Sequence, residues 1–178
     1  AEMAAGAPAV SDLSWLVNGA DTSFTGALAE KLVKPYAVLV PGCSRAKPEK
    51  RWPAKNFAAL AERFRDNNIS VVLTGTEADI DAVDMVKSLT PDAINLCGET
   101  SIADLAKLYS SAVSIVGNDT GPIFLAAASG APTIMVMGPD THPSMSAPTG
   151  PFCDWLQGTP ITKVSVDDVW CALQRFTN

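Results

Sequence analysis

Short, unbroken runs of apolar residues alternate with helix-like segments through most of this 178-residue chain. The first run, Tyr36–Val40, is rich in β-branched residues and is followed at once by Pro41 and Gly42, which is typical of a buried strand. Similar runs cover residues 70–74, 93–96, 112–116 and 133–137. Strands that are apolar on both faces are typical of a parallel sheet that is covered by helices on each side.

The segments between these runs carry apolar residues at helical spacing. Phe57, Leu60, Ala61 and Phe64 follow the i, i+3, i+4, i+7 pattern of one helix face. A second helix is expected at about 77–89, with Ile80, Val83 and Val86 facing inward. A third begins at a Ser101-x-x-Asp104 capping box and carries Ile102, Leu105 and Leu108. Two more are expected from Pro122 to a stop at Gly130, and at about 166–176. We therefore predict an α/β fold, a Rossmann-like doubly wound parallel sheet with helices on both faces.

The chain is long enough for one domain with a full core and too short for two. Residues 1–35 are rich in Ala, Gly, Ser and Asp and show weak periodicity. We interpret them as a linker or edge segment with one short helix near residues 27–32, and residues 36–178 as the Rossmann-like domain.

Charge and cysteine content exclude several classes of protein. The chain has 13 Lys and Arg against 19 Asp and Glu, and this acidic balance disfavours a nucleic-acid partner. Four scattered cysteines form no CxxC pair and there is one histidine, so we expect no metal site and a reducing, cytoplasmic setting. The longest apolar region, residues 123–137, is too short to span a bilayer.

Ligands of doubly wound sheets bind beyond the carboxyl ends of the strands. The loop at residues 41–55 follows the first strand and concentrates positive charge, because its one acid, Glu49, stands among Arg45, Lys47, Lys50, Arg51 and Lys55. This charge suits an anionic ligand such as a diphosphate, although a solvated basic loop explains it equally well. The chain lacks GxGxxG, GxxxxGK[ST] and GxSxG motifs, so dinucleotide, P-loop and α/β-hydrolase readings lose their usual support.

The second candidate is the GNDTGP block at residues 117–122. A glycine-flanked turn that leads into a helix presents backbone N–H groups and the positive end of the helix dipole, which favour phosphate. Asp119 would repel a phosphate and could instead cap the helix, for which Thr120 is an equally good candidate. Cys43 could be reactive at its strand end, but no base is visible nearby, and His142 is interpreted as a loop residue.

Several blocks in register resemble the carboxyl-terminal half of the family 9 glycosyltransferases, the ADP-heptose:lipopolysaccharide heptosyltransferases and their relatives. The matching blocks are PGCSRAKPEKRWPAKNFAALAERF, VVLTGTEAD and NLCGETSIADLAKLYSSAVSIVGNDTGPIFLAAASGAPTIMVMGP, within residues 36–178. KRWP and GNDTGP are the most specific of them. The resemblance implies one half of a GT-B fold, in which two Rossmann-like domains face each other across a cleft and the carboxyl-terminal one binds the nucleotide-sugar.

The resemblance also implies roles for individual residues. Those that would contact the donor phosphates and sugar are Cys43, Ser44, Lys50, Asp119, Thr120 and Gly121, with Lys50 neutralising the diphosphate. Glu77 or Asp79 would hold the ribose hydroxyls, and the loop with Gly98 and Thr100 would border the adenine. No metal and no cofactor are implied, and the ADP-sugar is the donor substrate.

The function implied is that of the donor-binding domain of an inverting glycosyltransferase, which moves heptose or a related sugar from an ADP-sugar to a lipopolysaccharide core acceptor. The expected partners are the nucleotide-sugar, an amino-terminal acceptor domain that supplies the catalytic base, and a lipid-linked saccharide acceptor. This chain alone is therefore expected to bind a donor and to be inactive in transfer. The resemblance implies a cytoplasmic location, and peripheral association with the inner membrane face is compatible with it.

Two departures from the family pattern leave alternatives open. Phe124 stands where many members have histidine, and GPDTHP replaces the usual GPTDP, with His142 in the acidic position. Both changes lie near the expected donor site and bear on which sugar is used. The alternative function is a non-catalytic nucleotide-binding or scaffold module, and a nucleotide-sugar epimerase of similar architecture is a weaker third, because the KRWP block does not support it.

Overall fold

The computed structural model describes residues 32–44 and 47–176. The helix expected near residues 27–32 and most of the expected linker at 1–35 lie outside the described residues. Residues 32–35 lead directly into the first strand, which begins at Tyr36 as expected.

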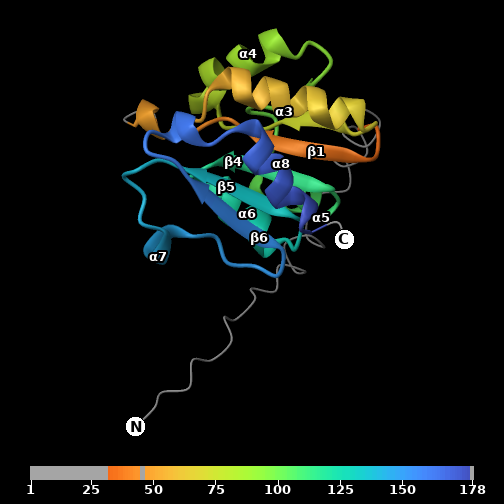
Figure 1. Ribbon diagram of the computed structural model, residues 1–178. Helices are drawn as coiled ribbons and strands as arrows, with labels where there is room; N and C mark the ends of the chain where they lie inside the picture. The colour runs from red at the N-terminus through yellow and green to blue at the C-terminus, as the bar shows by residue number, and fades with distance from the viewer. Residues whose placement is uncertain (1–31, 45–46, 177–178) are drawn as a thin grey trace.

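In the described part of the chain, six parallel strands form one sheet in the order β3-β2-β1-β4-β5-β6 (Figure 1). The strands are β1 (Tyr36–Val40), β2 (Ser70–Leu73), β3 (Ile94–Asn95), β4 (Ser114–Asn118), β5 (Thr133–Met137) and β6 (Cys153–Gln157). The order reverses between β1 and β4, which are neighbours in the sheet but far apart in the sequence. This reversal point is where a doubly wound sheet binds its ligand.

Helices cover both faces of the sheet, as the apolar runs predict. One core contains Leu39 of β1 with residues of α3 (Ala54–Asp66), α4 (Ile80–Leu89) and α8 (Val166–Gln174). The other contains Val38 with residues of α5 (Ile102–Ser110) and α6 (Gly121–Ala128). Alternate residues of β1 thus point into different cores, and this confirms the doubly wound α/β prediction.

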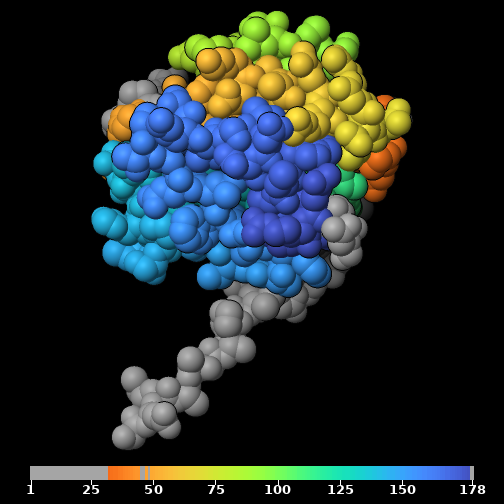
Figure 2. Space-filling model, in the orientation of Figure 1, coloured from red at the N-terminus to blue at the C-terminus, as the bar shows by residue number. Residues whose placement is uncertain are grey.

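Short helical turns complete the described chain. They are η1 (Pro48–Lys50), η2 (Glu77–Asp79), α7 (Pro143–Ser146) and η3 (Ile161–Lys163). In the space-filling view the blue end of the chain, which includes α8, lies beside α3 in yellow and orange (Figure 2). None of the helices in residues 32–44 and 47–176 is long and apolar enough to cross a bilayer.

Strand β6 has no counterpart among the predicted strands, since residues 153–157 lie outside the apolar runs. Its sequence, CDWLQ, mixes polar and apolar side chains, and each of them is at least partly exposed. A strand at the sheet edge needs little burial, so it lacks the apolar run that identifies the central strands.

One inward assignment was wrong. Ile80 is 42% exposed, because it lies at the first residue of α4, ahead of the turns that pack on the sheet. Ile102, the first residue of α5, is likewise 68% exposed. The capping box of Ser101 and Asp104 is confirmed, with the Ser101 hydroxyl accepting the Asp104 N–H.

Candidate functional site

Asn118, the last residue of β4, ties together the loops at the carboxyl edge of the sheet. Its side chain is fully buried, and its amide oxygen accepts the backbone N–H of Trp52 at 2.8 Å. Its amide nitrogen donates to the carbonyl oxygens of Pro41 at 2.8 Å and Gly42 at 3.4 Å. The sequence places Asn118 in a glycine-flanked turn and does not predict this role; an amide at the end of an apolar strand is the available signal.

Trp52 in the KRWP block is a packing residue. It is 1% exposed, contacts Phe57 edge-on at 5.0 Å between ring centres, and donates its indole N–H to the Val164 carbonyl at 2.8 Å. Together with Asn118 it fixes the segment that follows η1. Lys50 is the last residue of η1.

Lys50 and Asp119 meet across this edge. The Lys50 Nζ lies 2.6 Å from the Asp119 Oδ2, and the two side chains are only 16% and 12% exposed. The same carboxylate oxygen accepts the Thr141 hydroxyl at 2.8 Å. Asp119 therefore compensates the charge of Lys50 in this structure and orients its ammonium group.

Neither candidate cap of α6 caps the helix with its side chain. Thr120 is the N-cap residue, but its hydroxyl makes no capping hydrogen bond, and Asp119 is occupied by Lys50 and Thr141. Gly121 is exposed, and a Cβ built there would have no atom within 4 Å, so the helix N-terminus is open to a ligand. An open N-terminus is the feature that an anion requires.

Cys43 and Ser44 follow β1 and differ in exposure. The Cys43 side chain is 4% exposed and its thiol donates to the Lys47 carbonyl oxygen at 3.4 Å. Burial raises the pKa of the Cys43 thiol, which disfavours the reactive thiolate. Ser44 is exposed beside it, so the hydroxyl rather than the thiol faces solvent at this loop.

The structure separates the two acidic residues of the GTEAD loop. The Asp79 carboxylate accepts the backbone N–H and the hydroxyl of Thr76 at 3.0 and 2.7 Å, which makes a capping box around η2. It also lies so close to Gly42 that a Cβ at that position would clash with it. Glu77 is exposed and takes no part in this capping box. Of the two acidic residues, it is therefore the better candidate for binding a ribose.

A hollow of about 200 Å³ lies next to Glu77. Gly98 (φ 76°), Thr100 and Pro122 also line it, so it joins two of the predicted nucleoside loops to the start of α6. Deeper in its wall, the hydroxyls of Thr74 and Tyr109 are 3.3 Å apart, and burial raises the pKa of Tyr109 to about 12, which keeps the phenol neutral.

The predicted residues therefore fall into two groups at one edge of the sheet. Lys50, Asp119, Thr120 and Gly121 lie at the start of α6, and Glu77, Gly98 and Thr100 line the hollow. Cys43 and Ser44 lie on the loop that follows β1. Within the described residues, no three His, Cys, Asp or Glu side chains are placed to hold a metal ion.

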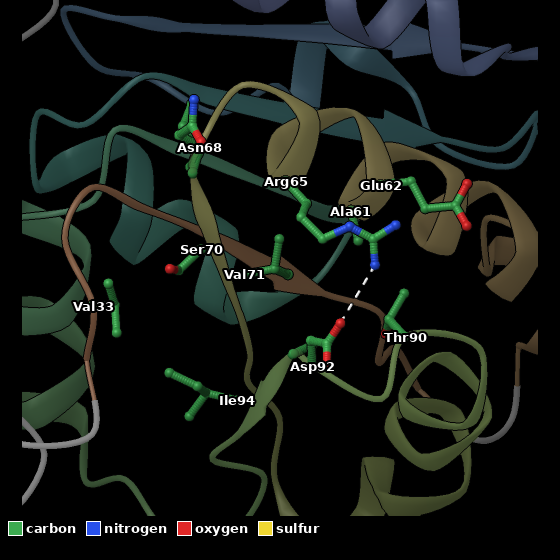
Figure 3. Close-up of a pocket in the computed structure, with 12 residues that line it drawn as sticks. Val33, Ala61, Glu62, Arg65, Asn68, Ser70, Val71, Thr90, Asp92 and Ile94 are labelled. Carbon is green, nitrogen blue, oxygen red and sulfur yellow. Dashed lines mark hydrogen bonds and ion pairs between the residues drawn. The ribbon is translucent and has the colours of Figure 1, made fainter.

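The larger hollow, of about 470 Å³, lies at the opposite end of the strands (Figure 3). Ser70 and Ile94, the first residues of β2 and β3, line it, and Arg65 reaches Asp92 at 3.5 Å. None of the predicted site residues lines this hollow. Its size therefore does not make it the candidate site.

Comparison with known proteins identifies the family. The model of "Glycosyltransferase family 9 (heptosyltransferase)" matches residues 9–154. The chain belongs to glycosyltransferase family 9. Curated relatives include the lipooligosaccharide heptosyltransferase 2 of Haemophilus influenzae, 30% identical over 120 residues that cover 65% of this chain and 34% of the relative. Lipopolysaccharide heptosyltransferase 2 of Escherichia coli K12 is 32% identical over 113 residues, covering 61% and 32%. This family 9 chain thus spans about a third of the length of these relatives.

Solved structures of family 9 proteins show the same fold. The E. coli ADP-heptose lipopolysaccharide heptosyltransferase II superposes with a TM-score of 0.74 at 22% identity, over 89% of this chain and 54% of that one. A family 9 glycosyltransferase from Veillonella parvula gives 0.75 at 22% identity, over 86% and 49%.

Proposed function

We propose that this chain is the donor-binding domain of an inverting glycosyltransferase that moves heptose, or a related sugar, from an ADP-sugar to a lipopolysaccharide core acceptor. The observation that carries the proposal is the position of the Lys50 ammonium, held by Asp119 at the carboxyl edge of the sheet where α6 begins with an exposed glycine. A cation beside an open helix N-terminus is suited to a diphosphate.

In the proposed reaction, a base outside this chain deprotonates the acceptor hydroxyl, whose oxygen then attacks the anomeric carbon. The bond between that carbon and the diphosphate oxygen breaks, and ADP leaves with the electron pair. Lys50 and the backbone N–H groups near Thr120 and Gly121 stabilise the charge that develops on the diphosphate. The loop of Cys43 and Ser44 borders the phosphates.

The nucleoside is proposed to occupy the hollow. Glu77 would accept hydrogen bonds from the ribose hydroxyls, and Gly98 and Thr100 would border the adenine. Asp79, the alternative ribose ligand, is left out of this proposal because its carboxylate caps η2. The ADP-sugar acts as a substrate, and no metal or further cofactor is part of the proposal.

The names of the relatives favour a transferase over a non-catalytic module. The curated relatives described above are heptosyltransferases, and the E. coli heptosyltransferase WaaC has been solved with ADP and with ADP-2-deoxy-2-fluoro heptose. The acceptor domain and the lipid-linked saccharide acceptor are proposed partners on the same ground. The cytoplasmic location stays a prediction.

Calorimetric titration of the chain with ADP tests the proposal. ADP should bind more tightly than adenosine or NAD, and added salt should weaken the binding because the diphosphate contacts are charge-assisted. Lys50→Ala should cost roughly 1.5–3 kcal/mol of binding free energy, because one hydrogen bond to a charged group is lost.

Lys55→Ala is the matched control, because Lys55 is an exposed lysine on α3 close by in the sequence. It should leave the affinity for ADP within about twofold. Equal affinity for adenosine and ADP, or an unchanged affinity in Lys50→Ala, would contradict the placement of the diphosphate beside Lys50.

A further inference from the structure

The loop at residues 138–142, between β5 and α7, contacts the Lys50–Asp119 pair through a buried hydroxyl. Thr141 is 3% exposed, and its Oγ1 donates to the Asp119 Oδ2 at 2.8 Å. That same oxygen accepts the Lys50 Nζ at 2.6 Å. Because both donors converge on one oxygen, the hydroxyl restricts the rotation of the carboxylate to which the ammonium is bound.

The side chain of Gln157, at the end of β6, holds this loop from the edge of the sheet. Its Nε2 donates to the carbonyl oxygens of Gly138 at 3.0 Å and Thr141 at 2.7 Å. The Thr141 backbone N–H also reaches the Gly138 carbonyl, at 3.3 Å. The turn is therefore closed by its own backbone and by the Gln157 amide, which fixes where the Thr141 hydroxyl points.

The same loop lies against the backbone that carries the lysine. A Cβ built on Gly138 would be 3.5 Å from the Glu49 carbonyl oxygen and 3.9 Å from the Lys50 Cα. The loop thus passes close to the Lys50 backbone at Gly138 and restrains the Lys50 ammonium through Thr141 and Asp119.

We propose that Thr141, held in place by Gln157, is a positioning residue for the donor diphosphate. It orients Asp119, and Asp119 in turn holds the Lys50 ammonium where the diphosphate arrives; the ligand in this inference rests on the proposed function. A lysine side chain has many rotamers, so an ammonium that is already fixed loses less conformational freedom when an anion binds. The effect of Thr141 on binding therefore passes through Lys50.

Three threonine variants test this role by calorimetry with ADP. Thr141→Val keeps the shape and removes the hydroxyl, and should weaken binding about tenfold, whereas Thr141→Ser keeps the hydroxyl and should restore affinity to within about twofold. Thr149→Val is the matched control, because Thr149 is exposed on the loop that precedes β6, and it should bind ADP like the parent. Unfolding curves confirm that each variant is folded at the titration temperature.

A double-mutant cycle separates positioning from a direct contact. In a Lys50→Ala background, Thr141→Val should change ADP affinity by less than about twofold, because the group that it positions is gone. An equal loss in both backgrounds would mean that Thr141 acts on the ligand or on the fold, and would overturn the proposal, as would parental affinity in Thr141→Val.

A ligand-free measurement keeps this proposal distinct from the proposed function. NMR relaxation of the Lys50 ε-methylene group should show a lower order parameter in Thr141→Val than in the parent, while the Lys55 ε-methylene group stays unchanged. A parent chain that binds no ADP would contradict the proposed function alone. An unchanged order parameter at Lys50 would overturn the positioning role, whatever the titrations give.

Discussion

The side-chain oxygen of Asn118 accepts the backbone N–H of Trp52 at 2.8 Å, although the two residues are 66 positions apart in the chain. The bond joins the end of β4 to the segment just before α3, and Asn118 is fully buried. Asn118→Leu should lower the free energy of unfolding by roughly 2–4 kcal/mol, because the Trp52 N–H and the Pro41 carbonyl lose their partner inside the protein. Urea unfolding monitored by circular dichroism measures this change.

Asn67→Leu is the control for Asn118→Leu. The Asn67 side chain also donates to a backbone carbonyl, that of Arg63 at 2.8 Å, but it does so at the exposed end of α3. Its substitution should change the unfolding free energy by no more than about 0.5 kcal/mol. Similar losses for both variants would show that the Asn118 bonds do not hold the carboxyl edge together.

Thr120→Ala should leave the stability of the chain nearly unchanged. Thr120 occupies the N-cap position of α6, where a threonine often caps through its side chain, but its hydroxyl makes no such bond here. The melting temperature should therefore stay close to that of the parent, with a free-energy change within about 0.5 kcal/mol. A loss near 1 kcal/mol would mean that the hydroxyl does cap the helix in solution.

Alanine variants at Glu77 and Asp79 should affect different properties. Asp79→Ala removes the capping box of η2 and should cost roughly 1 kcal/mol of stability, whereas Glu77→Ala, at an exposed position, should cost little. Glu77→Ala should instead weaken ADP binding about tenfold, because the proposed charge-assisted hydrogen bond to the ribose is lost. Titrations with ADP and unfolding curves for both variants test whether Glu77 affects binding and Asp79 affects stability.

The ribose contact has its own control. If Glu77 binds the ribose hydroxyls, Glu77→Ala should not weaken the binding of 2′,3′-dideoxy-ADP, which lacks both of them. An equal loss for ADP and for the dideoxy analogue would contradict the ribose assignment while leaving the diphosphate site intact.

The start of α8 should make stability depend on pH. The hydroxyl and the backbone N–H of Ser165 both donate to Asp168, and these bonds hold the pKa of that carboxyl below its ordinary value of 3.8. A carboxylate with a lowered folded pKa stabilises the fold above pH 3.8, and the stabilisation is lost as the pH falls through the lowered value. Asp168→Ala should therefore lower stability by about 0.5–1 kcal/mol at pH 7 and by less near pH 3, as urea unfolding at the two pH values would show. An equal stability difference between Asp168→Ala and the parent at both pH values would contradict a stabilisation by the ionised Asp168.

The central strands could be predicted because both of their faces are buried, which leaves an unbroken apolar run in the sequence. Strand β6 could not, because an edge strand needs only partial burial and CDWLQ carries no such run. The basic loop and the start of α6 could be proposed as phosphate-binding elements from their charge and glycines, and this role stays a prediction. The pairing of Lys50 with Asp119 was not, because it joins positions 69 residues apart and depends on the register of the sheet.

Thr141 and Gln157 illustrate the same limit. Neither residue type suggests a role in a loop rich in proline, and Gln157 acquires its partners only because β6 pairs with β5. The resemblance to the family supplied Glu77 and Asp79 as equal candidates for the ribose. Only the hydrogen bonds of Asp79 to Thr76 distinguished them.

Adjacent residues of the GNDTGP block are under different selective constraints. Asn118 is bound to three backbone groups of its own chain, so any descendant that still folds this way has reason to retain it, with or without a substrate. Asp119 is bound to Lys50 and Thr141, and each of these three is useful mainly while the others are present. A lineage that lost the proposed donor site would therefore be expected to vary at these three positions together while its asparagine stayed in place.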